Sequence, residues 1–141
     1  NRGLMANLRV NLDTAIFDAL NVATITNEAT GGVFNGVAPQ GTEPPFVVFS
    51  AMAKTDDYFA YSERGGQAVY MVKAIDRSPW PKSAGDIDTQ IDSALQDAAL
   101  SISGYSLISC RREEDIYLVE DLSGVMYQHV GGLYRIIADE S

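Results

Sequence analysis

The stretch "GGVFNGVAPQGTEPPFVVF", residues 31–49, sets a proline-rich turn between two apolar segments. The first segment, 33–37, is short and bounded by turn residues, which indicates a strand. Residues 38–45 contain three prolines, which remove backbone hydrogen-bond donors. The second segment, 46–53, is aromatic, β-branched and continuous, which is typical of a strand covered on both faces. The stretch therefore predicts two strands joined by a structured turn.

The glycines of this stretch do not fit a phosphate-binding loop. A Walker loop needs a lysine and then a serine or threonine after its last glycine, whereas Thr42 and Glu43 follow Gly41. A dinucleotide fingerprint needs a strand before the glycines and a helix after them. Here the preceding segment has helical spacing and the following one has strand character, so phosphate binding is not expected.

Two segments have apolar residues at the three- and four-residue spacing of an amphipathic helix. The first helix is predicted to begin near Asn7, a plausible cap, and to end at the polar residues 27–32. The second is predicted over 86–99, with acidic residues near its start, where the helix dipole favours negative charge. Ser83, three residues before Asp86, resembles a capping pair. The apolar stripes consist of Leu8, Leu12, Ala15, Ile16, Ala19 and Leu20 in the first helix, and of Ile87, Ile91, Ala94, Leu95 and Ala98 in the second.

Three further segments have strand character, namely 67–76, 105–121 and 125–139. A turn is predicted at 122–124, and two consecutive glycines at 131–132 suggest a bulge or a close backbone approach. Helices and strands do not alternate strictly. The predicted fold class is therefore α+β: an antiparallel-dominated sheet with two helices packed on one face, plus a long loop or hairpin arm.

The chain is expected to form a single domain over residues 1–141. Residues 1–4 precede Met5, a candidate natural start, and are a candidate extension. The segment 54–66 combines charges, aromatic residues and a Gly-Gly exit, and is interpreted as a projecting arm or loop. Because tyrosine and arginine are enriched at protein interfaces, we expect it to lie at an interface between subunits. The expected interface residues are Lys54, Asp56, Asp57, Tyr58, Phe59, Tyr61, Glu63 and Arg64.

The formal charge of −9 at pH 7 is shared by both halves of the chain. Nucleic-acid binding needs clustered lysine and arginine, so specific DNA binding is not expected. No apolar run approaches the roughly 20 residues of a membrane helix, so no membrane partner is expected.

No arrangement of residues suited to catalysis stands out. Cys110, the only cysteine, is interpreted as a small apolar strand residue, because the only histidine is distant in sequence and no oxyanion motif is visible. That histidine, His129, is interpreted as a satisfied structural residue. Asp56, Asp57 and Glu63 are interpreted as a charged loop, because nothing obvious desolvates them. The sequence therefore predicts neither an enzyme nor a cofactor or metal site.

Two other features have a structural and a functional interpretation. An acidic cluster at 113–121 would split between the two faces of an alternating strand, which favours a solvated strand edge over a metal site. Trp80 lies between two prolines and either anchors this connector to the core or contacts a partner. The members of the acidic cluster are Glu113, Glu114, Asp115, Glu120 and Asp121.

The sequence "VFNGVAPQGTEPPFVVF" resembles the phage tail completion family, whose members are also called tail-to-head joining or tail terminator proteins. In that family an N-terminal helix leads to a short strand, an "-APQG-" turn and a Pro-aromatic-Val-Val strand. Here the last three parts are residues 33–37, 38–41 and 45–49. A strand at 68–75, a helix ending in "ALQDAALSISGYSL" and a closing hairpin around a "D-x-x-G" turn at 121–124 extend the resemblance over nearly the whole chain.

The resemblance implies a non-catalytic virion protein that forms a homo-oligomeric ring, typically six-fold. The ring would cap the tail tube protein and join it to the head connector or head-completion protein at the head–tail junction, after assembly in the host cytoplasm. DNA would pass through the lumen without specific binding, and acidic walls would repel phosphates within about 8–10 Å. The proline turn would be a rigid structural element. Its residues are Pro39, Gln40, Gly41, Pro44 and Pro45.

Two alternatives stay open at the level of sequence. The first is another phage neck or tube component of related fold, such as a head-completion protein or the tube subunit itself. The second is a small intracellular ligand-binding or hydrolytic domain that uses Cys110 or His129.

Overall fold

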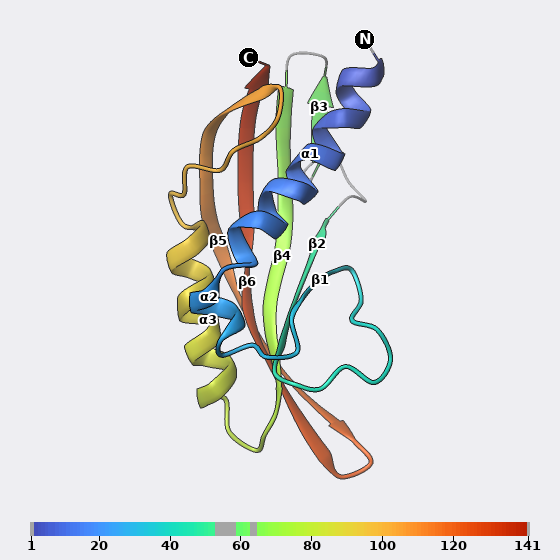
Figure 1. Ribbon diagram of the computed structural model, residues 1–141, viewed down its shortest axis with the longest axis vertical. Coiled ribbons are helices and arrows are strands. Elements are labelled where there is room, and N and C mark those ends of the chain that lie inside the picture. Colours follow the sequence, from blue (N-terminus) through green and yellow to red (C-terminus); the bar gives the residue numbers. More distant parts are fainter. Residues whose placement is uncertain (1, 53–58, 63–64, 141) are drawn as a thin grey trace.

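The computed structural model describes residues 2–52, 59–62 and 65–140, with side chains placed over 10–52 and 66–139. Three helices and six strands follow one another along this part of the chain (Figure 1). The fold class is α+β, as predicted. The elements are α1 (Arg2–Leu20), α2 (Ala23–Thr26), β1 (Val33–Asn35), β2 (Phe46–Ala51), β3 (Phe59–Ser62), β4 (Gly65–Arg77), α3 (Lys82–Leu95), β5 (Tyr105–Leu122) and β6 (Val125–Glu140).

The strands form one six-stranded sheet in the order β1-β2-β4-β6-β5, with β3 also paired to β4. Every neighbouring pair is antiparallel except β1 and β2, which run parallel. The parallel pair arises because the chain leaves β1, makes the turn of residues 38–45 and returns to the same end of the sheet. The prediction of an antiparallel-dominated sheet is confirmed.

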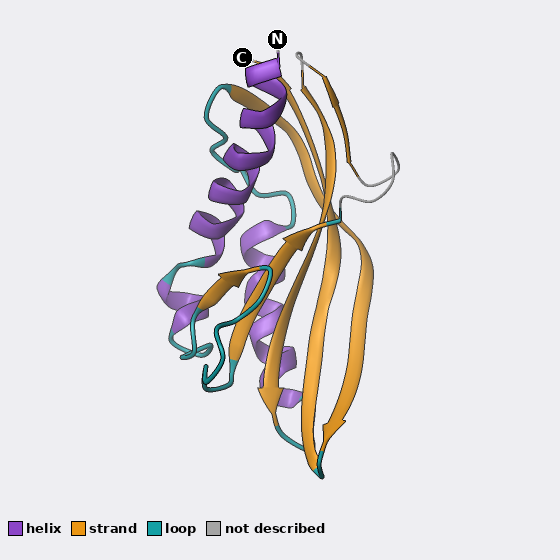
Figure 2. Ribbon diagram, turned by 90° about the vertical axis from the view of Figure 1, so that its right-hand side faces the viewer, coloured by secondary structure: helices purple, strands orange, loops and turns teal. Residues whose placement is uncertain are grey.

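All three helices cover the same face of the sheet (Figure 2). The apolar stripes predicted for the helices do face the core where side chains are described, because residues three and four apart share one helix face. Every second residue along the strands faces the helices and completes this core from the side of the sheet. Its largest fully buried members are Tyr70, Tyr134, Phe49, Leu12, Ile16, Leu20, Ile25, Ile87, Ile91, Leu95 and Ile136.

The helix boundaries differ from the predicted ones. The first helix ends at Leu20, and α2 follows after Val22, whose backbone is extended. The second begins at Lys82, four positions before Asp86, because Pro81 occupies the cap position and its carbonyl oxygen accepts from the Gly85 N–H at 2.7 Å. No side chain caps this helix, so the predicted Ser83–Asp86 pair is wrong, and no acidic residue lies in the first turn.

The predicted turn in the last third of the chain is confirmed, and it joins the two longest strands. Ser123 and Gly124 both have positive φ, and the Gly124 N–H donates to Asp121 Oδ1 at 2.8 Å. The hairpin of β5 and β6 extends beyond the helices at one end of the molecule (Figure 1). Its outermost pairs, Asp121 with Met126 and Leu122 with Val125, lie beyond Arg77, the last β4 residue that pairs with β6.

The two consecutive glycines of β6 mark a close approach, which was one of the two predicted options. A Cβ on Gly131 would lie within 2.5 Å of Lys73 Cα and closer still to the Val72 carbonyl oxygen. A Cβ on Gly132 would lie 2.5 Å from Arg112 Nε. The register shifts fall on β5 instead, at 107–109 and 112–114, so the bulges belong to the neighbouring strand.

Candidate interaction surfaces

The proline turn lies over one end of the sheet and is held by backbone contacts. Gly41 has a φ of +89°, and the Thr42 hydroxyl donates to the Pro39 carbonyl oxygen at 2.6 Å. The Gly31 N–H donates to the Pro45 carbonyl oxygen at 2.8 Å, which anchors the end of the turn next to β1. These contacts make the turn an ordered part of the fold. Its rigid role at a subunit contact stays a prediction.

The predicted interface segment 54–66 is only partly described. Six of the eight predicted residues lie outside the described residues, and Phe59 and Tyr61 belong to β3. β3 pairs antiparallel with the start of β4, from Phe59 with Ala68 to Ser62 with Gly65. A role of this segment in assembly therefore stays a proposal. The six undescribed residues are Lys54, Asp56, Asp57, Tyr58, Glu63 and Arg64.

The two candidate catalytic residues do not meet. Cys110 lies on the helix-covered face with 1% of its surface exposed, and burial, together with the charge of Asp97, raises the pKa of its thiol to about 12. His129 pairs with Ile75 and Leu118, nearer the opposite end of β6. A thiol protonated at neutral pH is a poor nucleophile, so the apolar strand residue is the interpretation that fits Cys110.

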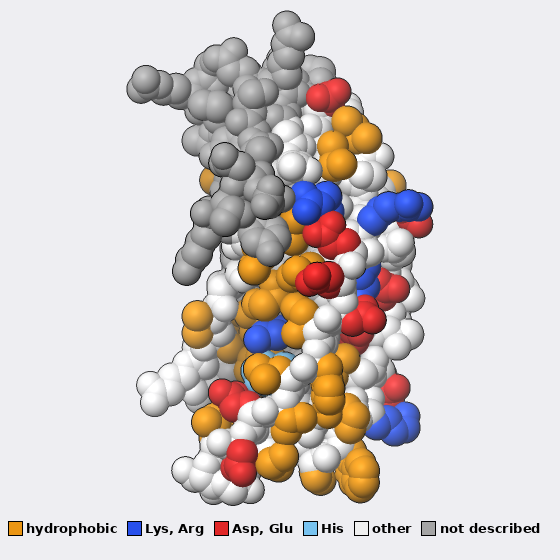
Figure 3. Space-filling model, turned by 180° about the vertical axis from the view of Figure 1, so that it is seen from behind, with side chains coloured by type: hydrophobic (Ala, Val, Ile, Leu, Met, Phe, Trp, Pro, Cys, Tyr) orange, Lys and Arg blue, Asp and Glu red, His pale blue; other side chains and the backbone are white. Residues whose placement is uncertain are grey.

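His129 lies on the sheet face opposite the helices, among apolar side chains (Figure 3). Its Nε2 is 3.1 Å from Glu120 Oε1, whereas its buried Nδ1 has no partner among the described residues. The prediction of a satisfied histidine is therefore wrong for one of its two nitrogens. Burial lowers the pKa of His129, the Glu120 hydrogen bond opposes this shift, and the charge of Lys73 adds to it.

We expect His129 to make stability depend on pH just below neutrality. The folded pKa lies below the unfolded value of about 6.5, so the unfolded chain binds more protons as the pH falls through this region. Stability should therefore be complete above about pH 7 and decline toward about pH 5.5. Urea unfolding of the wild type and of His129→Gln across this range measures the effect. Equal pH slopes for the two proteins would contradict it.

A cationic network connects α3 to the sheet. Arg112 donates to both carboxylate oxygens of Asp88, at 2.9 and 3.0 Å, and the two side chains are 15% and 14% exposed. It also donates to the Tyr134 hydroxyl at 3.2 Å and to the Gly131 carbonyl oxygen at 2.6 Å. Tyr134 in turn donates to Asp92 at 2.8 Å. Burial lowers the pKa of Arg112, but its hydrogen bonds to Asp88 and Tyr134 outweigh this and raise it overall.

The acidic cluster lies on β5, which is an edge strand of the sheet, as predicted. Glu113 accepts from Arg135 at 2.8 and 3.0 Å, and Asp115 accepts from Arg112 at 2.8 Å. Within residues 2–52, 59–62 and 65–140, no group of three histidine, cysteine or acidic side chains could hold a metal ion.

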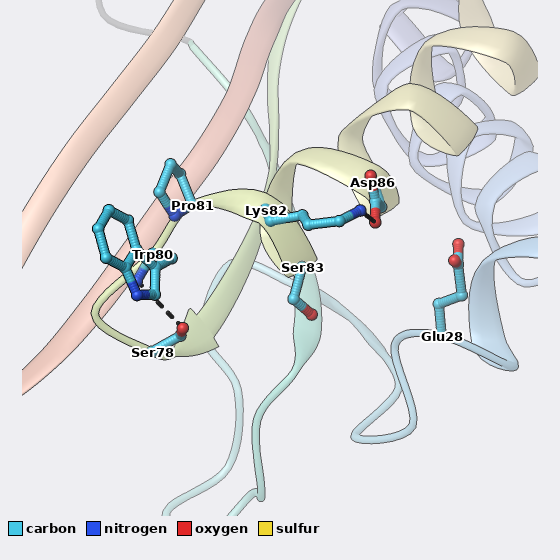
Figure 4. Close-up of a pocket in the computed structure, with 7 residues that line it drawn as sticks. All are labelled: Glu28, Ser78, Trp80, Pro81, Lys82, Ser83 and Asp86. Atoms are coloured by element: carbon cyan, nitrogen blue, oxygen red, sulfur yellow. Dashed lines mark hydrogen bonds and ion pairs between the residues drawn. The ribbon is translucent and has the colours of Figure 1, made fainter.

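Trp80 is not an anchor to the core, since 73% of its surface is exposed. It lines a hollow of about 830 Å³ at the start of α3 (Figure 4). In this view the indole ring lies on the side of the connector away from Glu28 and Asp86. The lining residues are Glu28, Ser78, Trp80, Pro81, Lys82, Ser83 and Asp86.

Large apolar side chains are also exposed on the β5–β6 hairpin. Their exposed fractions range from 39% for Val119 to 59% for Tyr117. Sequence reasoning missed this surface, although the run "IYLV" before an acidic turn could have indicated it. Since single exposed apolar residues are normal but clusters mark contacts, this end of the molecule is a candidate interface. The exposed members are Tyr117, Leu118, Val119, Leu122 and Val125.

None of the helices in the described ranges is both long enough and apolar enough to be a candidate for spanning a membrane. That the protein binds neither specific DNA sites nor a membrane remains a prediction.

Comparisons with known proteins identify one matching family and several solved structures of the same fold. No curated protein matches the sequence. Among solved structures, a chain from the virion of a native gene transfer agent particle shares the fold, with a TM-score of 0.67, 16% identity, and 91% of this chain and 94% of that chain covered. The gp17 protein of bacteriophage SPP1 also shares it, with a TM-score of 0.52, 17% identity, and 96% and 88% covered. The family described as tail completion protein gp17 matches residues 14–123, so the chain belongs to this family of phage tail completion proteins, which are structural components of the virion.

Proposed function

We propose that the chain is a tail terminator, which forms a ring that caps the finished tail tube and joins it to the head connector. The observation that carries this proposal is the family match over residues 14–123. A ring of six copies is the expected assembly. The sheet and the helices that cover it enclose an apolar core. Such a core suits a subunit that must stay folded before it assembles.

The charge of the chain supports a location around passing DNA. Each subunit carries a formal charge of −9, and five of the six lysines and arginines with described side chains are already ion-paired. DNA binding needs free cations that can displace phosphate counterions. A lumen lined by this protein would therefore let DNA pass without retaining it.

Electron microscopy of particles that carry a gold-labelled C-terminal tag tests the location. Gold at the head–tail junction supports a terminator or neck ring. Gold along the whole tail would indicate a tube subunit instead of a terminator. No gold on any particle would contradict a place in the virion.

The segment 54–66 is proposed to contact a neighbouring subunit or the tube. Deletion of residues 57–64 is expected to leave a folded monomer, because among the described strands the deleted β3 pairs with β4 alone, but to abolish capping of tails. Circular dichroism checks the fold, and electron microscopy of tails scores the capping. Tails of normal length from this deletion would refute the role of the segment.

A further inference from the structure

We propose that the exposed residues at the hairpin end of the molecule form one docking surface, with an apolar centre and an acidic rim, for a different protein of the particle that carries basic residues around its contact patch. The hairpin-end surface consists of Trp80, Tyr117 and Val119, the last two of which share the helix-covered face of the hairpin with Gln128. The proposal deepens the proposed function and rests on it only for the place of the partner within the particle.

Hydrogen bonds tie the connector that carries Trp80 to the base of the hairpin. The Ser78 N–H donates to the Met126 carbonyl oxygen at 3.0 Å, and the Gln128 side chain donates to the Ser78 carbonyl oxygen at 3.1 Å. The Tyr117 hydroxyl donates to Gln128 Oε1 at 2.8 Å. Trp80 and Tyr117 are therefore linked through Gln128 and Ser78, and belong to the same end of the fold.

Local contacts hold the backbone of Trp80 and the side chain of Tyr117 before any partner arrives. The Trp80 backbone N–H donates to Ser78 Oγ at 3.1 Å, and the prolines on both sides of Trp80 restrict its backbone. The exposed fractions are 73% for Trp80 and 59% for Tyr117. Tryptophan and tyrosine are the residue types that dominate binding hot spots, and a side chain that is already ordered loses less entropy on binding.

The charge at this end indicates which partner fits. From residue 113 to 134 the chain has five acidic residues and no lysine or arginine. Asp115 and Asp121 lie on the same face of the hairpin as Tyr117 and Val119, and Asp115 has its only described cation in Arg112. An acidic rim disfavours DNA and favours a protein with lysine or arginine around its contact patch.

A second copy of this chain fits the surface poorly. It would bring another charge of −9, and like charges at a contact are unfavourable. Over residues 10–52 and 66–139, every lysine and arginine except the half-buried Lys73 is already in an ion pair. The described surface of a copy thus has no exposed, unpaired cation to offer. The hairpin-end surface is better matched to another protein than to the neighbour in a ring.

Photo-crosslinking in assembled particles tests this directly. A benzophenone amino acid replaces Trp80 in one variant and Ile108 in another, since Ile108 is a 59% exposed residue at the far end of β5. Mass spectrometry should identify an adduct between position 80 and a different, basic protein, with none from position 108. An adduct of position 80 with a copy of the same chain, or no adduct at all, would overturn the proposal.

A binding measurement adds an energetic test. The variant Trp80→Ala/Tyr117→Ala should bind purified tails that were assembled without this chain at least tenfold more weakly than wild type, while Ile108→Ala binds normally. The thermal midpoint of each isolated variant shows that folding is retained. Unchanged binding of the double variant would overturn the proposal. If gold marks the whole tail and position 80 crosslinks to a basic protein, the terminator function is refuted and the docking surface is supported. If gold marks the junction and position 80 crosslinks to a copy of the chain, the docking surface is refuted and the terminator function is supported.

Discussion

Replacement of Arg112 by methionine is expected to destabilise the fold by about 3–5 kcal/mol, because removal of one partner leaves a buried carboxylate uncompensated. Asp88, 14% exposed, would lose both of its charge-assisted hydrogen bonds. The Gly131 carbonyl oxygen would lose the one from Arg112. Such a cost is a large share of the roughly 5–15 kcal/mol that stabilises a typical domain. Urea unfolding at neutral pH measures it.

The neighbouring residue provides a matched control. Arg111 is also ion-paired, with Asp97 at 3.1 Å, but the two side chains are 67% and 61% exposed. Arg111→Met is therefore expected to cost no more than about 1 kcal/mol. A double-mutant cycle of Arg112→Met with Asp88→Asn separates the pair from the rest of the network. Equal losses for the two arginine variants would show that burial does not govern the strength of this network.

Replacement of Gly131 by alanine is expected to cost at least about 3 kcal/mol, at the upper end of what overpacking costs. The new methyl group would collide with the Val72 carbonyl oxygen and with Lys73 Cα. Both atoms belong to the backbone of β4, the central neighbour of β6, and cannot move without disturbing the sheet. The midpoint of chemical denaturation measures the loss.

Gly85→Ala is the control for this substitution. Gly85 lies inside α3 with nothing within 4 Å of an added Cβ, so alanine should stabilise the protein by about 0.5–1 kcal/mol through its higher helix propensity. A loss for Gly131→Ala no larger than the usual surface effect would mean that β4 and β6 adjust freely at this point.

Much of the secondary structure could be predicted from local patterns. The apolar stripe of Ile87, Ile91 and Leu95 identified α3, and the continuous run from Phe46 identified β2. Boundaries were less accurate, because the cap at Pro81 depends on the conformation of the connector before the helix rather than on the polarity of nearby residues.

The cationic network was not predicted. In sequence, Arg111 and Arg112 form a pair followed by acidic residues, and nothing distinguishes the two. Strand alternation carried a usable signal, since Arg112 is two positions after the buried Cys110 and therefore shares its face. The partner Asp88 lies 24 positions away on α3, and only the packing of that helix on the sheet brings the two together.

The periodic elements, the proline turn, the acidic character and the family could be predicted from the sequence, because each of these depends on residues that are near neighbours in the chain. Three other features could not be predicted: which cation is buried, which nitrogen of His129 has no partner, and that Trp80 lies at the same end as the β5–β6 hairpin. These features depend on contacts across the sheet and between layers. Burial changes the energy of a charge or an aromatic ring far more than its local sequence does, and burial exists only once the layers have packed.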